Sequence, residues 1–134
     1  MKVIFLDIDG VLNNNNTKMD LGWEPSLVKI LNYIVKETEA KIVLSSTWRR
    51  TEHYRNIIKN DMKIDFIDVT PKLWKERGHE IQAWLDKNPD VDNFIILDDD
   101  SDMVHLMAHL LQTDGKFGLT NEIADKAIKQ LNNS

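Results

Sequence analysis

The sequence has no cysteine among its 134 residues, and only five glycines and three prolines. The absence of cysteine excludes disulfide bonds and thiolate metal sites. No apolar run approaches the roughly 20 residues that a membrane-spanning helix needs, and the first apolar run is too short for a secretion signal. These absences favour a protein of the reducing cytoplasm, and we expect neither a membrane segment nor a leader.

An excess of basic residues is also lacking, because the formal net charge is −5. An acidic chain is not expected to coat nucleic acid over a wide surface, so contact with a polyanion must depend on a local basic patch. Hydrophobic residues make up 42% of the chain and charged residues 29%, which is ordinary for a globular protein. Without repeats or linkers, the sequence predicts one domain over residues 1–134.

The chain begins with a short apolar strand that ends in acidic residues. Residues 3–6 read Val-Ile-Phe-Leu, which is typical of a strand buried on both faces of a parallel sheet. Asp7, Asp9 and Gly10 follow it, and the glycine permits a sharp turn. Further strands are predicted at residues 41–44 and 94–97, with a weaker one at 63–67 and a short one near 116–119.

Helical spacing of apolar residues predicts helices between these strands. They cover residues 25–38, 52–59, a segment around 81–85, 103–110 and the stretch after Thr120, while residues 13–22 form a loop. Strands that alternate with helices indicate βαβ units, so we predict an α/β, Rossmann-like three-layer sandwich with a central parallel sheet. Ligands of such sheets bind beyond the carboxyl ends of the strands.

Four aspartates are expected to meet at that edge, namely Asp7 and Asp9 from the first strand and Asp98 and Asp99 from the fourth. Two like charges about 4 Å apart repel by roughly 4 kcal/mol at an effective dielectric constant near 20. A divalent cation would offset this repulsion, and hard carboxylate oxygens without cysteine suit Mg²⁺.

Hydroxyl and basic side chains are predicted beside the acids. Ser45 and Ser46 end the second strand, and Lys72, Lys75 and Arg77 precede the fourth. Acids, a metal, a hydroxyl and a cation together match the needs of phosphoryl transfer, because the positive groups neutralise the charge on the phosphoryl oxygens. A carboxylate can also act as the nucleophile and form an aspartyl-phosphate.

This order of motifs resembles the haloacid dehalogenase (HAD) superfamily. The matching stretches are Asp-Ile-Asp-Gly-Val-Leu at 7–12, Lys-Ile-Val-Leu-Ser-Ser at 41–46, the basic stretch around Arg77, and Ile-Ile-Leu-Asp-Asp at 95–99. Residues 46–49, 70–71 and 77–81 are similar to small cap-less HAD domains of phages and bacteria, some of which are linked to RNA repair.

The resemblance implies roles for the four aspartates. Asp7 would be the nucleophile and a Mg²⁺ ligand, and Asp9 would be the general acid/base with its backbone carbonyl on the metal. Asp99 would complete the metal site with Asp98 beside it. Val11 stands where the family commonly has threonine.

The resemblance also implies the groups that bind the phosphoryl oxygens. Ser45 is favoured over Ser46 for this role, and Ser46 stays open as the alternative. Arg77 is favoured over Lys75 as the cation, because the usual lysine-proline pair is missing.

A basic and aromatic rim is predicted around the site. Trp48, Arg49 and Arg50 follow the serine pair, and Lys72 and Lys75 approach from the neighbouring strand end. Of these we expect Trp48, Arg49 and Lys75 to contact the substrate, since aromatic rings stack on bases and cations attract phosphates. A carboxylate partner for Arg49 inside the protein is the alternative.

The resemblance therefore implies a Mg²⁺-dependent phosphomonoesterase that acts through an aspartyl-phosphate, with nucleic-acid or nucleotide phosphate ends as candidate substrates. Residues 11–40 and 51–76 are too few to hold a large cap domain. The alternatives are a small-molecule phosphatase or nucleotidase and a non-catalytic phosphate-binding module. A response-regulator receiver is disfavoured, because a receiver would carry its phospho-acceptor aspartate on the third strand and not on the first.

Overall fold

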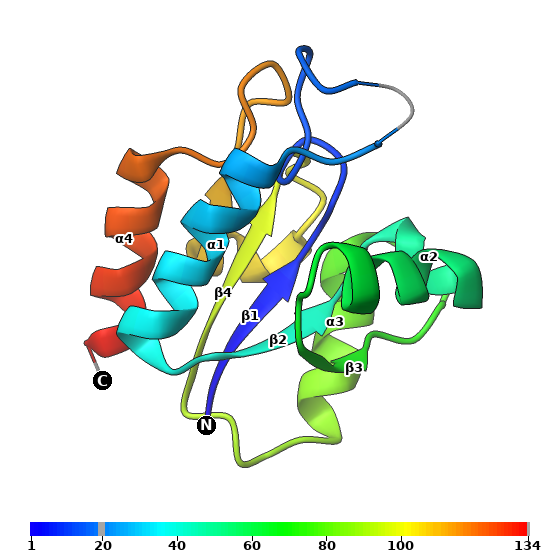
Figure 1. Cartoon of the computed structure of the whole chain (residues 1–134). Coiled ribbons are helices and arrows are strands. Elements are labelled where there is room, and N and C mark those ends of the chain that lie inside the picture. Colours follow the sequence, from blue (N-terminus) through cyan, green and yellow to red (C-terminus); the bar gives the residue numbers. More distant parts are fainter. Residues whose placement is uncertain (19–20, 134) are drawn as a thin grey trace.

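Five parallel strands form one sheet in the order β3-β2-β1-β4-β5 in the computed structural model, which describes residues 1–18 and 21–133 (Figure 1). The central strand β1 pairs with β2 on one side and with β4 on the other. The strands are β1 (Lys2–Leu6), β2 (Lys41–Leu44), β3 (Phe66–Val69), β4 (Asn93–Asp98) and β5 (Leu110–Gln112).

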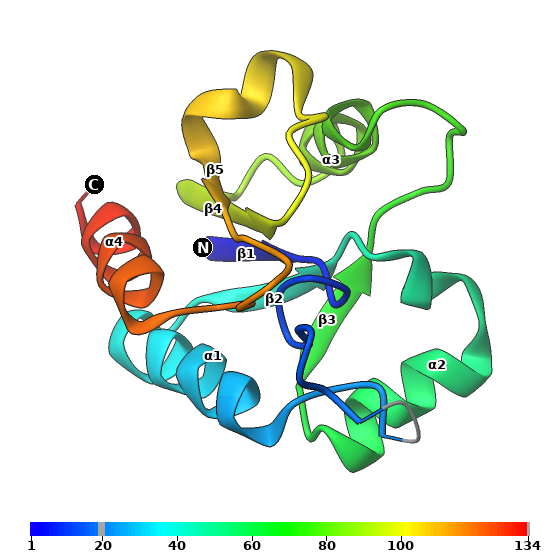
Figure 2. The ribbon, with the colours of Figure 1, turned by 90° about the horizontal axis from the view of Figure 1, so that it is seen from above.

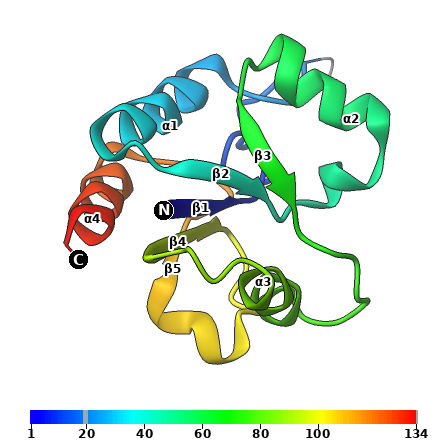
Figure 3. The same cartoon turned by 90° about the horizontal axis from the view of Figure 1, so that it is seen from below.

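Helices cover both faces of the sheet, as the views from above and below show (Figures 2 and 3). One face carries α1 (Pro25–Thr38), α4 (Asn121–Asn132) and α2 (Glu52–Asn56), which continues into the π-helical turn η2 (Ile57–Asp61). The other face carries α3 (Arg77–Asp86) and the 3₁₀ helix η3 (Val104–His109). The predicted three-layer α/β sandwich is confirmed.

The alternation of side chains along β1 divides the core into two layers. Ile4 and Leu6 pack into the cluster that α1 and α4 complete, whereas Val3 and Phe5 face α3. The ring of Phe5 meets the ring of Trp84 edge to face, with centroids 5.5 Å apart. Both faces of β1 are thus fully apolar, which is why this strand contains a continuous apolar run.

Hydrogen bonds of the sheet also hold the first residue after β1 and the first residue after β2. The backbone N–H of Asp7 donates to the Leu97 carbonyl at 3.0 Å, and the N–H of Ser45 donates to the Leu6 carbonyl at 3.0 Å. These bonds extend the ladder by one residue at the carboxyl ends of β1 and β2. Two predicted site residues are therefore held by the sheet itself.

The third strand begins later than predicted. It covers Phe66–Val69 in place of residues 63–67. Lys63 has a positive φ of 57°, and the Ile64 N–H donates to the Ile58 carbonyl at 3.0 Å. These residues close the turn after η2, so the strand starts only once that turn is complete.

The helix predicted at residues 103–110 is only partly confirmed. A 3₁₀ helix of six residues, η3, occupies this region, and Leu110–Gln112 forms the edge strand β5 beside Ile96–Asp98. The strand predicted near residues 116–119 is wrong, because Asp114 and Gly118 form only an isolated bridge. Leu110 and Leu111 pair with β4 at the edge of the sheet, so they do not continue the helix.

The connections around the site are short, as predicted. Between β1 and α1 the described residues form turns, and the connection between β2 and β3 holds η1 (Thr47–Arg50), α2 and η2. Residues 19 and 20 of the predicted loop lie outside the described residues. No cap domain occurs in the described part of the chain. None of its helices is both long and apolar enough to cross a membrane.

Candidate active site

Three of the predicted aspartates meet at the carboxyl ends of β1 and β4. Asp7, Asp98 and Asp99 each offer a carboxylate oxygen, and these oxygens lie within 4.8 Å of one another. Asp7 is only 6% exposed, Asp98 is fully buried and Asp99 reaches solvent. The cluster therefore has two buried acids at its base and one at its mouth.

Arg77 supplies the positive charge of the cluster. Its Nη1 atom lies 3.2 Å from Oδ1 of Asp7 and 2.7 Å from Oδ2 of Asp98. Arg77 is the first residue of α3, so the start of this helix points the guanidinium at the strand ends. Lys75 is exposed in the loop before the helix. The structure thus brings Arg77, and not Lys75, to Asp7.

Burial and neighbouring charges shift the pKa values of Asp7, Asp99 and Arg77. Burial raises the pKa of Asp7 from its ordinary value of 3.8 to about 8, and the charge of Asp98 adds to this rise while Arg77 opposes it. The pKa of Asp99 is raised in the same way by burial and by Asp98. Burial alone would lower the pKa of Arg77, but its two carboxylate partners raise it.

The segment after β4 holds the start of α3 in place. Oδ2 of Asp102 accepts from the Arg77 backbone N–H at 3.2 Å, and the Asp102 carbonyl accepts from the Gly78 N–H at 3.0 Å. A Cβ atom at Gly78 would overlap the Met103 carbonyl group. The two backbones therefore pack directly against each other, and a side chain at Gly78 would separate them.

The donor set fits Mg²⁺. All three candidate ligands are carboxylates, the hard oxygen donors that this ion prefers. Only one guanidinium lies among three acids in the described structure, which leaves negative charge that a divalent cation would neutralise. Gly10 keeps the mouth open, because a Cβ atom at this position would overlap the Asp99 carboxylate.

The Asp9 side chain lies outside this group of three carboxylates. Its Oδ1 atom accepts from Asn13 Nδ2 at 2.9 Å, and both carboxylate oxygens accept from Trp48 Nε1 at 3.3 and 3.2 Å. The two donors fix the direction of the carboxylate at the solvent-exposed entrance. This position suits proton transfer, and it leaves only the backbone carbonyl of Asp9 for the metal role predicted from the sequence.

The two serines after β2 differ in what their hydroxyl groups do. Oγ of Ser46 accepts from the Trp48 backbone N–H at 3.2 Å and caps η1. Oγ of Ser45 is buried and has no hydrogen-bond partner within the described part of the chain. An orphaned hydroxyl at a strand end favours Ser45 over Ser46 as the group that accepts a ligand.

Arg49 does not lie on the predicted rim. Its side chain is buried, with Nη2 2.9 Å from Oε1 of Glu80. Nη1 donates to the Ser45 and Ser46 carbonyls at 3.2 and 2.8 Å, and Nε donates to the Thr70 carbonyl at 3.0 Å. The expectation of substrate contact is therefore corrected to the alternative of an internal carboxylate partner. Arg49 joins the ends of β2 and β3 to α3.

Sequence reasoning missed three residues that shape the site. The sequence predicts only a loop around Asn13, yet the Asn13 Oδ1 atom accepts from the Gly10 N–H at 2.7 Å and holds the turn after β1. Glu80 and Asp102 were not recognised as partners of Arg49 and of the start of α3. An asparagine three residues after a turn glycine is a usable signal, whereas the two acids carry none.

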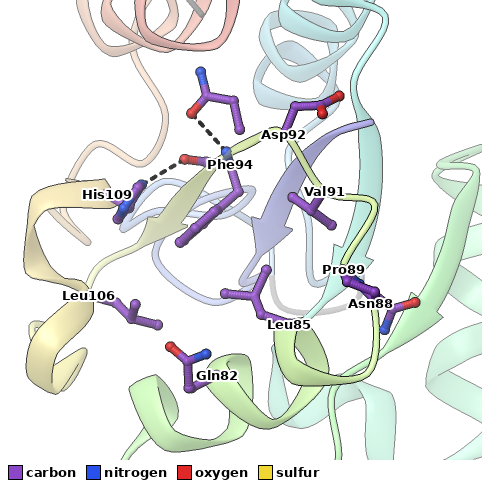
Figure 4. Close-up of a pocket in the computed structure, with 10 residues that line it drawn as sticks. Gln82, Leu85, Asn88, Pro89, Val91, Asp92, Phe94, Leu106 and His109 are labelled. Atoms are coloured by element: carbon purple, nitrogen blue, oxygen red, sulfur yellow. Dashed lines mark hydrogen bonds between the residues drawn. The ribbon is translucent and has the colours of Figure 1, made fainter.

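One pocket of the described structure lies away from this chemistry (Figure 4). It has a volume of about 310 Å³ and lies between α3, η3 and the start of β4. His109 stacks on Phe94 there and contacts the Phe94 carbonyl through Nδ1 at 3.1 Å. None of the lining residues belongs to the acidic cluster, because the pocket is at the amino end of β4 and the acids are at its carboxyl end.

The comparisons with known proteins agree with the predicted fold. A search among curated proteins finds no match to the chain. One family model, described as the HAD domain in Swiss Army Knife RNA repair proteins, matches residues 3–124, a range that includes every residue of the site. The chain therefore belongs to the family of HAD domains in Swiss Army Knife RNA repair proteins.

Proposed function

We propose that the chain is a Mg²⁺-dependent phosphomonoesterase in which Asp7 is the nucleophile. The observation that carries this proposal is the position of Asp7 at a buried strand end, among Asp98 and Asp99 and 3.2 Å from Nη1 of Arg77. A carboxylate in such a place can attack phosphorus while the guanidinium binds a phosphoryl oxygen. The match to a family of HAD domains supports the proposal of a phosphatase.

In the first half-reaction an Asp7 carboxylate oxygen attacks the phosphorus atom of the ester. The bond between phosphorus and the leaving alcohol oxygen breaks, and Asp9 gives its proton to that oxygen. Arg77 and the free hydroxyl of Ser45 bind phosphoryl oxygens during the transfer. The products are an alcohol, an aspartyl-phosphate on Asp7 and an ionised Asp9.

In the second half-reaction Asp9 takes a proton from a water molecule as that water attacks the same phosphorus atom. The bond between phosphorus and the Asp7 oxygen breaks, so that inorganic phosphate leaves and both aspartates return to their first state. Asn13 and Trp48 keep the Asp9 carboxylate in one direction through both steps.

Asp7, Asp98 and Asp99 would hold the Mg²⁺ ion together with the Asp9 carbonyl. The bound ion supplies positive charge that offsets the negative charge of the phosphoryl oxygens and of the clustered acids. The same site without the ion keeps Asp7 largely protonated near neutral pH, since its pKa is about 8. A protonated Asp7 is a poor nucleophile, so the metal-free protein is expected to be inactive.

Phosphate ends of nucleic acids are the substrates that we favour. Within the described residues no cap domain covers Asp7, so a large substrate can approach, and the family description names RNA repair. A small phosphorylated metabolite would use the same chemistry. Comparison of a phosphorylated oligonucleotide with the matching mononucleotide decides between the two.

The experiment is release of phosphate from p-nitrophenyl phosphate by the purified chain, with MgCl₂ or with EDTA. We expect release only with Mg²⁺, and loss of release in Asp7→Asn. Asp125→Asn is the matched control, because Asp125 is an exposed acid on α4. Rapid acid quenching should trap phosphate on the wild-type chain and none on Asp7→Asn. Activity of Asp7→Asn within tenfold of wild type would overturn the assignment.

A further inference from the structure

The most exposed large hydrophobic side chain in the described structure is Trp74, which is 81% exposed. It lies in the loop between β3 and α3 and has a positive φ of 56°. An L residue of this size rarely adopts such a backbone conformation, and strained positions persist only where the surrounding structure fixes them. The exposed side chain of Trp74 and its strained backbone are both unfavourable for folding, so we expect this residue to have a function.

Buried groups hold the Trp74 loop in this conformation. The backbone N–H of Leu73 donates to Oε2 of Glu80 at 2.8 Å, and the other Glu80 oxygen pairs with Arg49. Nη2 of Arg49 also donates to the Pro71 carbonyl at 3.4 Å. The same buried pair that joins β2 to α3 therefore fixes the residues on the N-terminal side of Trp74, and the indole is presented from an anchored loop.

Basic side chains surround the exposed indole. The guanidinium carbon of Arg50 lies 5.0 Å from the centre of the Trp74 ring, and Lys72 Nζ donates to the Arg50 carbonyl at 3.4 Å. Lys75 is exposed next to Trp74, while the following acid, Glu76, has His79 3.6 Å away. We call Arg50, Lys72, Trp74 and Lys75 the basic rim. It is a local positive patch on a chain of net charge −5.

The basic rim lies beside the proposed phosphate site. Trp74 is three residues before Arg77, whose Nη1 atom contacts Asp7. Three residues span at most about 11 Å between Cα atoms. The backbone of Trp74 is therefore close to the residue whose guanidinium contacts Asp7, so a strand whose terminal phosphate lies at Asp7 can extend toward the Trp74 loop.

We propose that the basic rim is a binding subsite for single-stranded nucleic acid, in which one base stacks on Trp74 and the neighbouring phosphates contact Arg50, Lys72 and Lys75. A flat aromatic ring among cations matches a flat base among phosphates, and base stacking needs no particular sequence. Only the placing of the strand's phosphorylated end at Asp7 rests on the proposed function. Binding to the basic rim does not require catalysis.

The first test measures binding without turnover. A fluorescent single-stranded RNA octamer that carries a terminal phosphate is titrated into Asp7→Asn protein, and its Kd is compared with that of Asp7→Asn combined with Trp74→Ala. We expect Trp74→Ala to weaken binding on the order of tenfold, and Trp74→Phe to restore most of the affinity. The melting temperature checks that each variant is folded.

Tyr33→Ala is the matched control, because Tyr33 is an exposed aromatic residue on α1, 47% exposed. It should leave the Kd for the octamer as it is. Lys75→Ala should lower the slope of log Kd against log salt by about 0.7, the value for one phosphate contact of a single strand, and Lys36→Ala on α1 should not. A Kd unchanged by Trp74→Ala, or equal competition by an acidic peptide, would overturn the proposal.

The second test separates this inference from the proposed function. The ratio of kcat/KM for the phosphorylated octamer to that for p-nitrophenyl phosphate should fall on the order of tenfold in Trp74→Ala, mainly through KM. An unchanged ratio overturns the basic rim but leaves the phosphatase. Wild-type protein that hydrolyses no ester overturns the phosphatase, and the binding test still decides on the basic rim.

Discussion

Nη2 of Arg49 lies 2.9 Å from Oε1 of Glu80, and both side chains are almost fully withdrawn from water, with 1% and 7% of their surface exposed. The pair joins the loop after β2 to α3, and Arg49 also binds the backbone carbonyls of Ser45 and Ser46. A residue whose neighbours in sequence suggest substrate contact is thus a structural brace of the site.

Arg49→Met should destabilise the protein strongly, because it leaves the buried Glu80 carboxylate without its partner. Removal of one member of a buried pair costs about 3–5 kcal/mol. Urea unfolding measures the loss. Arg50→Met is the control and should cost under about 0.5 kcal/mol, since Arg50 is exposed. An Arg49→Met loss below about 1 kcal/mol would show that the brace has little importance for folding.

Metal-free protein should become less stable as the pH rises from about 4 to about 8. In this window the unfolded chain releases the Asp7 proton, because its pKa is 3.8 there, whereas the native state keeps the proton up to about pH 8. The native state then binds more protons than the unfolded state, so the free energy of unfolding falls with rising pH and levels off above pH 8.

Urea unfolding in EDTA at several pH values checks this trend. Asp7→Asn removes the titrating group, and the difference between wild type and this variant isolates its contribution. We expect the variant to gain stability relative to wild type as the pH rises. A difference that is independent of pH would show that burial does not raise the pKa of Asp7.

Mg²⁺ should raise the melting temperature of the wild-type chain. An ion that binds only the native state adds about 2.7 kcal/mol at a concentration one hundred times its Kd. Asp99→Asn should weaken this effect, while Asp100→Asn, which changes the next acid along the chain, should retain it. Equal Mg²⁺ stabilisation in Asp99→Asn and in wild type would exclude the Asp99 side chain from the metal site.

Asp9→Asn should slow phosphate release by roughly 10²–10⁴-fold while Mg²⁺ affinity is largely retained. The side chain can no longer transfer a proton, but the backbone carbonyl is unchanged. Steady-state kinetics and a Mg²⁺ titration of the melting temperature test the two halves of this prediction. Loss of Mg²⁺ affinity instead would mean that the Asp9 carboxylate is itself a ligand.

Much of the fold could be predicted because local signals and tertiary packing agree. The apolar runs in β1, β2 and β4 are buried on both faces, and Thr120 caps α4 through the Ile123 N–H as expected. Residues 103–110 misled the prediction, since their helical spacing is equally compatible with a short 3₁₀ helix followed by an edge strand. Pairing with β4, a tertiary interaction, decides between the two.

In the candidate site too, the features set by local sequence could be predicted and those set by tertiary contacts could not. Asp7, Ser45 and Asp98 are placed by strand ends, which the sequence marks clearly. The direction of the Arg49 side chain could not be predicted, because its partner Glu80 is 31 residues away and Arg50, with the same chemistry, points to Trp74 instead. Contacts distant in sequence determine which of two adjacent arginines is buried.

The direct packing of the Gly78 backbone on the Met103 backbone affects how this part of the molecule moves. The helix that carries Arg77 and the segment that follows Asp98 and Asp99 share hydrogen bonds through Asp102 and leave no side chain between them. Thermal fluctuations should therefore open these two segments as one cooperative unit. The amide hydrogens of Arg77 and Gly78 would exchange with solvent at a common rate, and each such opening would move the cation away from Asp7 and Asp98, which the sheet still holds.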